Sequence, residues 1–170
     1  LFRSPSQFYD EAYFINLKDH TKRLKNFKNR SKSANLGNIV RFDAVDTRNG
    51  KYEDYKKYIN ENTLKRLHVT VKNGIRKSHE DLQPGAVGCY LSHLFIYKKA
   101  LQSGKKVIFV MEDDVNFVSG FVKKFNACMR MAPPDFDILL LGYSNQGSKK
   151  IMNKFWVKIS RFYQLHSYII

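Results

Sequence analysis

The chain has 170 residues, of which 43% are hydrophobic and 14% aromatic, and this composition is that of a globular protein and not of a disordered one. No apolar run approaches the ~20 residues that a helix needs to cross a bilayer, which excludes a transmembrane segment. The 30 Lys and Arg residues against 15 Asp and Glu give a formal net charge of +15, which favours an anionic partner but also fits a lysine-rich surface that is only solvated.

We expect a single domain over residues 1–170, because the chain is long enough for one core and short for two. The chain stops on the apolar stretch HSYII, so we expect further sequence after Ile170. Cys89 and Cys128 fall in helix-like patterns, which favours buried free thiols over a disulfide or a metal site. The compartment stays open on these grounds, with the cytoplasm favoured over a secretory lumen.

The first half of the chain predicts a strand, a basic helix, a second strand, a helix and a small hairpin, in residues 12–17, 18–32, 38–46, 51–67 and 68–78. Leu24 and Phe27 share one face of the basic helix. The hairpin is predicted to turn at Asn73 and Gly74, because Asn-Gly is the strongest short hairpin signal.

The second half predicts a long helix, a strand, a shorter helix and two further strands, in residues 84–102, 107–111, 119–132, 136–142 and 155–170. The apolar stripe of the long helix is Val87, Leu91, Leu94 and Leu101. Residues 107–111 form a continuous apolar run, typical of a strand buried on both faces in a parallel sheet. The alternation of strands and helices predicts an α/β domain, although the pairing of the last strand cannot be predicted.

Three adjacent carboxylates, Glu112, Asp113 and Asp114, follow this buried strand. In open α/β sheets ligands bind beyond the carboxyl ends of the strands, so these acids stand where a binding site is expected. If the backbone stays extended, Glu112 and Asp114 project to one side and Asp113 to the other. Paired carboxylates can hold Mg²⁺ or Mn²⁺ on a diphosphate, and the alternative is that these acids are exposed loop or capping residues.

Several segments, in their order along the chain, resemble glycosyltransferase family 25, which contains bacterial lipopolysaccharide-type galactosyltransferases and collagen hydroxylysine glycosyltransferases. The matching segments are YFINLKDHTKRL, RFDAVDTRNG, PGAVGCYLSHLFIYKKAL, VIFVMEDDVNF, FDILLLG and LHSYII. The Gly-Cys-x-x-Ser-His and Glu-Asp-Asp elements, separated by a helix, form the more specific combination. The resemblance implies an α/β, Rossmann-like nucleotide-diphosphosugar transferase fold with a mostly parallel sheet flanked by helices.

The resemblance also implies a metal-dependent inverting enzyme. It would move a hexose, galactose or glucose, from a UDP-sugar to a hydroxyl on a glycan or on a collagen-like, hydroxylysine-type protein. Carried over by position, Glu112 and Asp114 would hold Mn²⁺ (or Mg²⁺) on the diphosphate. The residues implied to contact the donor are Asn16 and Asp46 at the base and ribose, Asp113 near the ribose, Arg23 at the base or phosphates, and Ser92.

Other polar residues have several interpretations. Adjacent Ser92 and His93 point about 100° apart on a helix, which disfavours a catalytic dyad. His166 is a candidate metal ligand or acceptor contact, although a lone His in a strand is more often structural. Asp135 and Asp137 are candidate general bases, with capping and loop solvation favoured. The sequence therefore assigns no catalytic residue.

Two other functions stay open. The charge and the acids suggest a basic nucleic-acid-binding domain or a metal-dependent nuclease, although the basic residues are spread along the chain without an aromatic-basic RNA motif. A relic of the fold that binds donor without transferring sugar is the third hypothesis.

The basic segment in residues 18–32 holds seven Lys or Arg, and it is either a contact with an anionic surface or the solvated face of an amphipathic helix.

Overall fold

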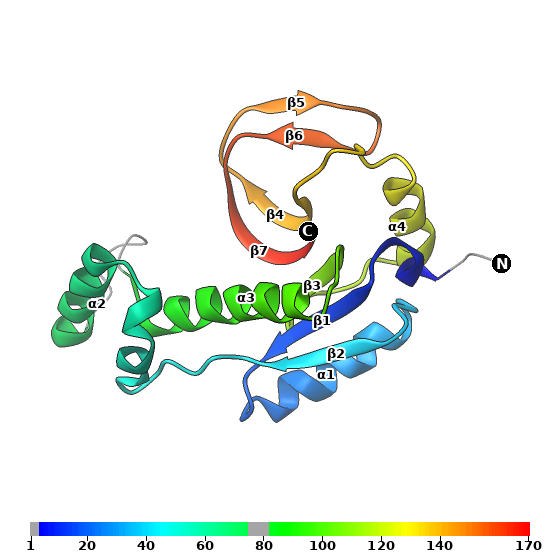
Figure 1. Ribbon diagram of the computed structural model, residues 1–170. Coiled ribbons are helices and arrows are strands. Elements are labelled where there is room, and N and C mark those ends of the chain that lie inside the picture. Colours follow the sequence, from blue (N-terminus) through cyan, green and yellow to red (C-terminus); the bar gives the residue numbers. More distant parts are fainter. Residues whose placement is uncertain (1–3, 75–81) are drawn as a thin grey trace. The chain divides into compact units, whose positions relative to one another are not determined.

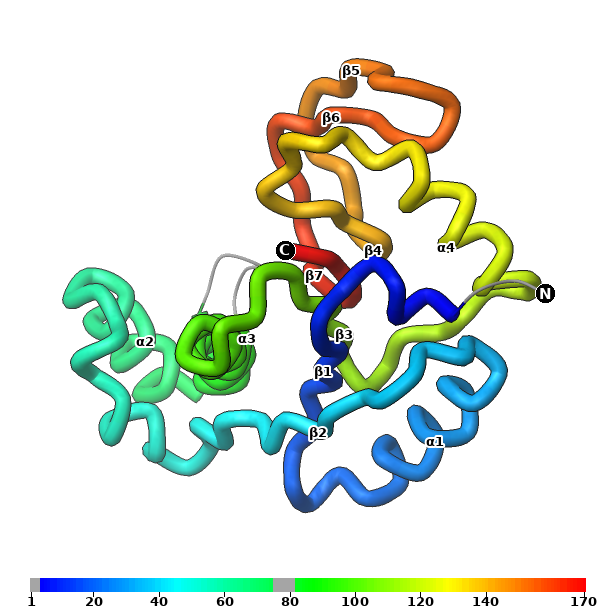
Figure 2. Tube along the Cα trace, turned by 45° about the vertical axis from the view of Figure 1, so that its right-hand side comes forward, coloured from blue at the N-terminus to red at the C-terminus, as the bar shows by residue number. Residues whose placement is uncertain are grey.

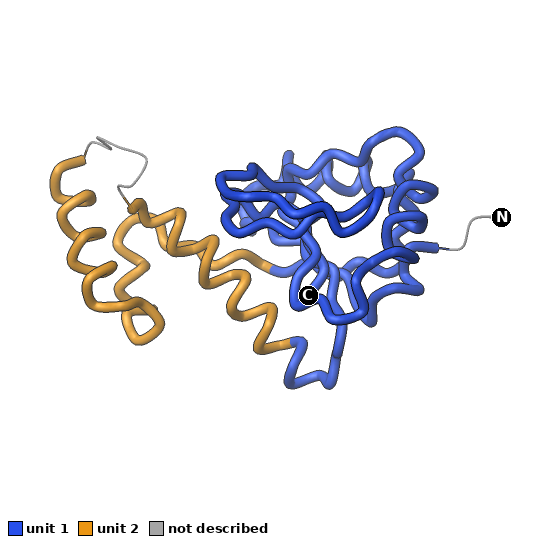
Figure 3. Tube along the Cα trace, turned by 90° about the horizontal axis from the view of Figure 1, so that it is seen from above, with its two compact units in different colours: residues 1–42, 100–170 blue, residues 43–99 orange. Residues whose placement is uncertain are grey.

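The structure, a computed structural model, describes residues 4–74 and 82–170 (Figure 1). The chain forms two compact units (Figure 3): a sheet unit, residues 1–42 and 100–170, and a helical unit, residues 43–99. The prediction of one domain over residues 1–170 stays a prediction. The elements in chain order are η1 (Pro5–Phe8), β1 (Glu11–Asn16), α1 (Thr21–Lys32), β2 (Ile39–Asp43), η2 (Lys51–Tyr58), α2 (Glu61–Asn73), α3 (Pro84–Gln102), β3 (Ile108–Glu112), α4 (Phe121–Met129), β4 (Leu139–Asn145), β5 (Lys149–Ile151), β6 (Val157–Ile159) and β7 (Phe162–Ile169), where η marks a 3₁₀ helix.

The sheet unit is built on a five-stranded sheet with the strand order β2-β1-β3-β7-β4. β1 and β3 are parallel, and β7 is antiparallel to both of its neighbours, β3 and β4. β1, β3 and β4 therefore run in one direction, and the inserted β7 opposes them. The predicted α/β class with a Rossmann-like sheet is confirmed, and β7 supplies the strand pairing that the sequence left open.

The central strand β3 is buried on both faces, as its apolar run predicts, and Ile108–Met111 are at most 4% exposed. On one face, α1 packs through Phe27, whose ring stacks on that of Phe14 in β1 at a centroid distance of 4.2 Å. α4 packs on the same apolar cluster through Phe125, whose ring centroid lies 5.7 Å from that of Phe109 in β3. Both helices lie on one side of β1 and β3 in Figure 2.

The helical unit packs η2, α2 and most of α3 around a smaller apolar cluster. Its buried members are Tyr52, Leu67, Val87 and Leu91. The two aromatic residues Tyr58 and Phe95 meet edge to face at its margin, with 5.2 Å between their ring centroids. These contacts fix η2 against α3, which positions the segment that follows β2.

The predicted hairpin over residues 68–78 is wrong where the structure describes it, because residues 68–73 continue α2. Asn60 caps this helix by accepting a hydrogen bond from the backbone N–H of Asn62 at 2.9 Å. Gly74 has a positive φ of 66° and donates its N–H to the carbonyls of Thr70 and Val71, so it ends the helix instead of turning a hairpin. Residues 75–78 of the prediction lie outside the described residues.

Other predictions of local structure need smaller corrections. Leu101 is 75% exposed, so the apolar stripe of α3 ends before it. The second strand stops at Asp43 instead of residue 46, and the strand predicted at residues 136–142 is β4 at Leu139–Asn145. The cysteines form no disulfide in the described parts, but neither is buried as predicted, because Cys89 is exposed and Cys128 is only partly buried. Within the described residues, no helix combines the length and apolarity that crossing a membrane requires.

Candidate functional site

The three acids after β3 occupy the carboxyl end of the central strand. Glu112 is the last residue of β3 and pairs with Ile15 of β1 in the parallel register. The chain then turns, and the backbone N–H of Val115 donates to the carbonyl of Glu112 at 3.4 Å. The acids therefore lie at the edge of the sheet where open α/β folds bind ligands.

Asp113 points into a buried polar network. Its carboxylate accepts a hydrogen bond from Nδ2 of Asn16 at 2.7 Å through one oxygen and from Arg23 at 3.0 Å through the other. The Asp113 side chain is 7% exposed, whereas that of Arg23 is 55% exposed. Asn16, at the end of β1, is 1% exposed. The structure thus brings together three of the residues predicted to contact the donor, and it uses the oxygens of Asp113 within the fold.

Two arginines that the sequence analysis did not single out complete this network. Arg41 of β2 donates through Nε to Oδ1 of Asn16 at 3.1 Å. Arg30 of α1 donates to the backbone carbonyls of Asp113 and Val115 at 2.7 and 2.9 Å, which holds the turn after β3 against α1. The signal in the sequence was weak, because an arginine on a basic helix or in a strand is ordinarily a solvated surface residue.

Glu112 and Asp114 project to the other side of the turn, toward His166 of β7. Nδ1 of His166 lies 3.5 Å from Oε2 of Glu112 and 3.8 Å from Oδ1 of Asp114. We call these three residues the acid–histidine cluster. Their side chains are partly exposed, at 25% for Glu112, 45% for Asp114 and 38% for His166. The expected division of the three acids between two sides of the strand is therefore present in the structure.

The acid–histidine cluster fits a divalent cation on two independent observations. One ligand atom from each of the three side chains lies within 4.8 Å of the others, close enough for all three to reach one ion. Nδ1 of His166 is buried and has no hydrogen-bond partner among the described residues. Carboxylate oxygens and an imidazole nitrogen are a donor set that suits Mn²⁺, and Mg²⁺ through the carboxylates.

His166 is positioned by the strand pairing that the sequence could not predict. β7 is antiparallel to β3 and pairs Ser167 with Met111, so the preceding residue stands beside the acidic end of β3. Gly142 of β4 lies beside it, and a Cβ there would stand 3.7 Å from that of His166. The one signal in the sequence was a histidine in a segment that resembles a strand, which is not specific.

Ser92, also predicted at the donor, is an internal contact of the helical unit. It is 0% exposed, its hydroxyl donates to the carbonyl of Gly88 at 2.6 Å, and it accepts from the backbone N–H of Val45 at 2.9 Å. A Cβ on Gly88 would stand 2.5 Å from the carbonyl oxygen of Val45, so this glycine is required for close packing of α3 against the segment after β2. His93 beside it is also buried.

Asp46, the remaining residue predicted to contact the sugar donor, lies in the helical unit and pairs with two basic side chains. Its oxygens accept from Arg48 at 2.7 and 3.0 Å, and Nζ of Lys51 lies 3.5 Å away. The hydrogen bonds from the Arg48 side chain and backbone hold the pKa of the Asp46 carboxyl well below its usual range. The donor role predicted for Asp46 stays a prediction.

Comparison with protein-family models identifies the family to which this chain belongs. The model of glycosyltransferase family 25 (LPS biosynthesis protein) matches residues 9–168. The chain belongs to glycosyltransferase family 25. The match spans both the acid–histidine cluster and the Ser92 contact, and it favours a transferase over the nucleic-acid-binding or nuclease hypothesis.

Named relatives agree with the family and differ in what their names say. The chain is 29% identical to human procollagen galactosyltransferase 2 over 139 residues, which cover 79% of this chain and 21% of the relative. It is 26% identical over 154 residues to a putative glycosyltransferase of Acanthamoeba polyphaga mimivirus, covering 89% of this chain and 43% of that protein. It is 30% identical over 130 residues to a probable inactive glycosyltransferase 25 family member 3 of Rattus norvegicus, covering 75% of this chain and 21% of the relative.

The family 25 chain therefore spans about a fifth of the length of its procollagen galactosyltransferase relative. Relatives named as transferases and relatives named as inactive both match it, so family membership alone does not establish activity.

Proposed function

We propose that this family 25 chain binds a UDP-sugar with Mn²⁺ or Mg²⁺ and serves an inverting transfer of a hexose to a hydroxyl. The acceptor is a glycan or a collagen-like protein. Galactose is the favoured hexose over glucose, because the human relative is named as a galactosyltransferase. The observation that carries the proposal is the acid–histidine cluster at the carboxyl end of β3.

Glu112, Asp114 and His166 are the residues that would hold the divalent ion. When bound, such an ion neutralises the charge that develops on a departing diphosphate. The chain's own contribution is preorganisation, because β3 and β7 fix the backbone of two of the ligands before donor arrives. The sequence assigned no general base, and we propose none.

The buried network behind the cluster keeps the turn in place. Asp113 holds Asn16 at the end of β1 and Arg23 on α1, and Arg30 holds the backbone on either side of Asp114. The Arg23 side chain is half-exposed while it binds Asp113, so part of it remains accessible to a donor phosphate or base. Asp113 therefore acts in this proposal as a positioning residue.

The decisive experiment is calorimetric binding of UDP with and without Mn²⁺, on the wild-type chain and on Asp114→Ala. We expect Mn²⁺-dependent binding in the wild type and its loss in the variant, because Asp114 lies in the turn after β3 beside His166 and is not a core residue. Asp135→Ala is the matched control, since it also removes one exposed carboxylate from the sheet unit. Equal UDP affinity in the wild type and in Asp114→Ala would refute the metal assignment.

A second measurement separates donor binding from transfer. Incubation with UDP-galactose or UDP-glucose and Mn²⁺ should release UDP slowly by hydrolysis, and this release should disappear in Glu112→Gln. If the chain binds UDP but releases none from UDP-galactose or UDP-glucose, it resembles the relatives that are named as inactive in its lack of activity.

A further inference from the structure

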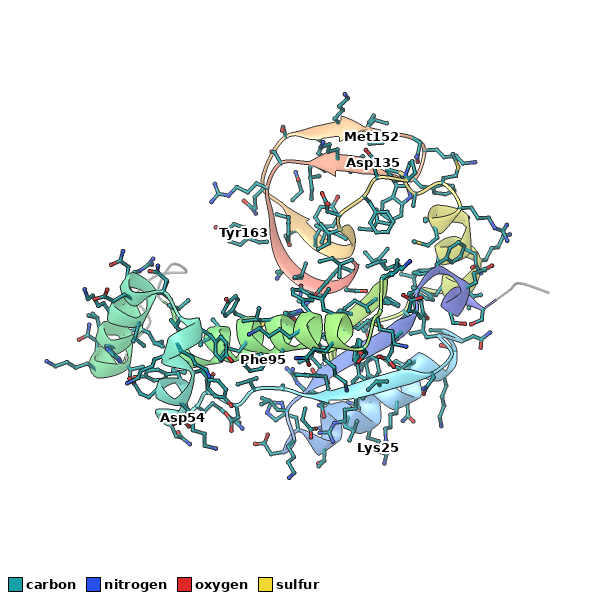
Figure 4. All side chains as sticks on the ribbon, viewed as in Figure 1. Lys25, Asp54, Phe95, Asp135, Met152 and Tyr163 are labelled. Atoms are coloured by element: carbon teal, nitrogen blue, oxygen red, sulfur yellow. The ribbon has the colours of Figure 1, made fainter. Side chains whose placement is uncertain are left out.

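The hairpin formed by β5 and β6, which we call the basic hairpin (residues 149–161), exposes apolar side chains at its tip. These strands form their own two-stranded sheet, apart from the five-stranded one (Figure 1). The apolar residues exposed there are Ile151 at 79%, Met152 at 47%, Phe155 at 40% and Val157 at 37%. Figure 4 labels Met152 on this hairpin and Asp135 in the loop after α4. Ile151 and Val157 stand opposite each other across the two strands, and adjoining exposed apolar side chains indicate a candidate interaction site.

The same hairpin concentrates positive charge. Residues 138–170 contain no Asp or Glu, and their five cations are Lys149, Lys150, Lys154, Lys158 and Arg161. Lys150 of β5 stands directly opposite Lys158 of β6 in the strand register. Like charges at that position repel each other, and neither lysine pairs with a carboxylate in the part of the chain that the structure describes. A polyanionic surface would relieve this repulsion.

The basic hairpin is held rigidly from behind. Nε1 of Trp156 donates to the carbonyl of Cys128 at 2.8 Å, and its ring packs against the main apolar cluster of the sheet unit. Nδ2 of Asn153 donates to the carbonyl of Met131 at 2.9 Å, while its Oδ1 accepts from the backbone N–H groups of Phe155 and Trp156. These contacts hold the tip in place before binding, which reduces the backbone entropy lost on binding.

We propose that the basic hairpin docks on an anionic lipid surface. The exposed tip residues Ile151, Met152 and Phe155 enter the headgroup region, and the lysines around them contact lipid phosphates. Exposed apolar side chains with lysines on the same hairpin suit the interface of a membrane, where the apolar part is buried and the ammonium groups stay hydrated. Phe155 carries such a group beside it, since Nζ of Lys154 lies 5.0 Å from its ring centroid.

Helix α1 contains most of the basic segment that the sequence analysis singled out, but it has no exposed apolar side chains beside its basic residues. Its apolar residues Leu24 and Phe27 both pack on the main cluster of the sheet unit. The exposed face of α1 is therefore entirely polar, and it offers charge without insertion. This difference makes α1 a control for purely electrostatic attraction, independent of the proposed transferase activity.

The test is flotation of the chain with vesicles of phosphatidylcholine, with or without anionic phosphatidylglycerol. We expect binding only to the anionic vesicles. The double variant Lys149→Gln/Lys154→Gln should bind about 25-fold more weakly, because Lys149 shares a face of the hairpin with Ile151, Lys154 lies beside Phe155, and each lysine near such a surface contributes about a factor of five. The matched pair Lys22→Gln/Lys25→Gln on α1 removes the same charge and should change binding by less than about threefold, because neither lysine lies beside exposed apolar residues.

Trp156 gives a second readout at the hairpin, because it is the single tryptophan of the chain. Vesicles that carry brominated acyl chains should quench its fluorescence. Ile151→Ser/Phe155→Ser should abolish the quenching and the part of the binding that survives high salt, whereas the electrostatic part should fall with salt in every variant.

Three results would overturn the proposal. Equal losses from the hairpin pair and the α1 pair would mean unspecific attraction by net charge. A dimer in sedimentation that Ile151→Ser/Phe155→Ser disperses would assign the face to a second copy of this chain. Binding of single-stranded DNA through Lys149 and Lys154, with no quenching by brominated lipid, would assign it to nucleic acid.

Discussion

The acid–histidine cluster and Ser92 were both candidate parts of a donor site in the sequence, but their polar atoms differ in their hydrogen-bond partners. Ser92 has a backbone donor and a backbone acceptor at hydrogen-bond distance and no solvent exposure. His166 stands between two carboxylates and keeps a buried Nδ1 without a hydrogen-bond partner among the described residues. The polar atoms of Ser92 are therefore satisfied within the fold, whereas the Nδ1 atom of His166 is the part of the cluster to which the proposal assigns a ligand.

Asp113 belongs with Ser92 in this comparison, although it lies between the two acids of the cluster. Its oxygens are used by Asn16 and Arg23, so it is bound to the fold while Glu112 and Asp114 face His166. Substitutions of fold-bound residues should therefore lower stability, and substitutions in the cluster should affect ligand binding with little cost in stability.

The largest effect on stability is expected for Asp113→Ala. It removes two hydrogen bonds to a nearly buried carboxylate and leaves an amide N–H of the buried Asn16 without its partner. The free energy of unfolding, measured with urea, should fall by about 3 kcal/mol. Asp114→Ala is the control and should change it by less than about 0.5 kcal/mol. Equal losses of stability in the two variants would refute the distinction between fold-bound residues and residues of the cluster.

The next effect tests close packing in the helical unit. Gly88→Ala places a Cβ 2.5 Å from the carbonyl oxygen of Val45 and 2.7 Å from the hydroxyl of Thr47, so the backbone must shift. We expect a loss of about 2 kcal/mol in the free energy of unfolding. Gly85→Ala, on the same helix with no atom within 4 Å of the new Cβ, should be neutral or stabilising by up to about 1 kcal/mol.

A smaller loss is expected for Ser92→Ala. The change removes the acceptor of the Val45 N–H and should lower the free energy of unfolding by about 1 kcal/mol. Ser103→Ala, in the exposed turn that follows α3, serves as the control. If Ser92→Ala leaves stability unchanged but weakens UDP binding, Ser92 contacts the donor as the family resemblance implies. Its assignment as a residue that serves only the fold would then be wrong.

The smallest effect concerns acid pH. Arg48 lowers the pKa of Asp46, so this group stabilises the fold fully above its unfolded pKa of about 3.9. Its contribution is lost as the pH falls below that value toward the lower pKa of the folded state. In an NMR titration Arg48→Gln should raise the pKa of Asp46 toward its ordinary value. An unchanged titration would show that Arg48 does not bind Asp46 in solution.

The sequence by itself determined the class of the fold and predicted where a candidate site lies. The continuous apolar run of β3 required a strand buried on both faces, and the three acids after it followed from chain order alone. Their division between two sides is as expected, but it arises in the turn that follows Glu112 and not along an extended backbone.

Only the tertiary structure decided which residues complete each side. His166 reaches Glu112 because β7 inserts antiparallel beside β3, and Arg41 reaches Asn16 from β2. The predicted hairpin was wrong at residues 68–74 for a local reason, because Gly74 ends α2 as its C-cap, and Val69 and Val71 lie exposed on this helix. Pairing between segments distant in the chain depends on the summed burial of many side chains, which no local pattern of residues encodes.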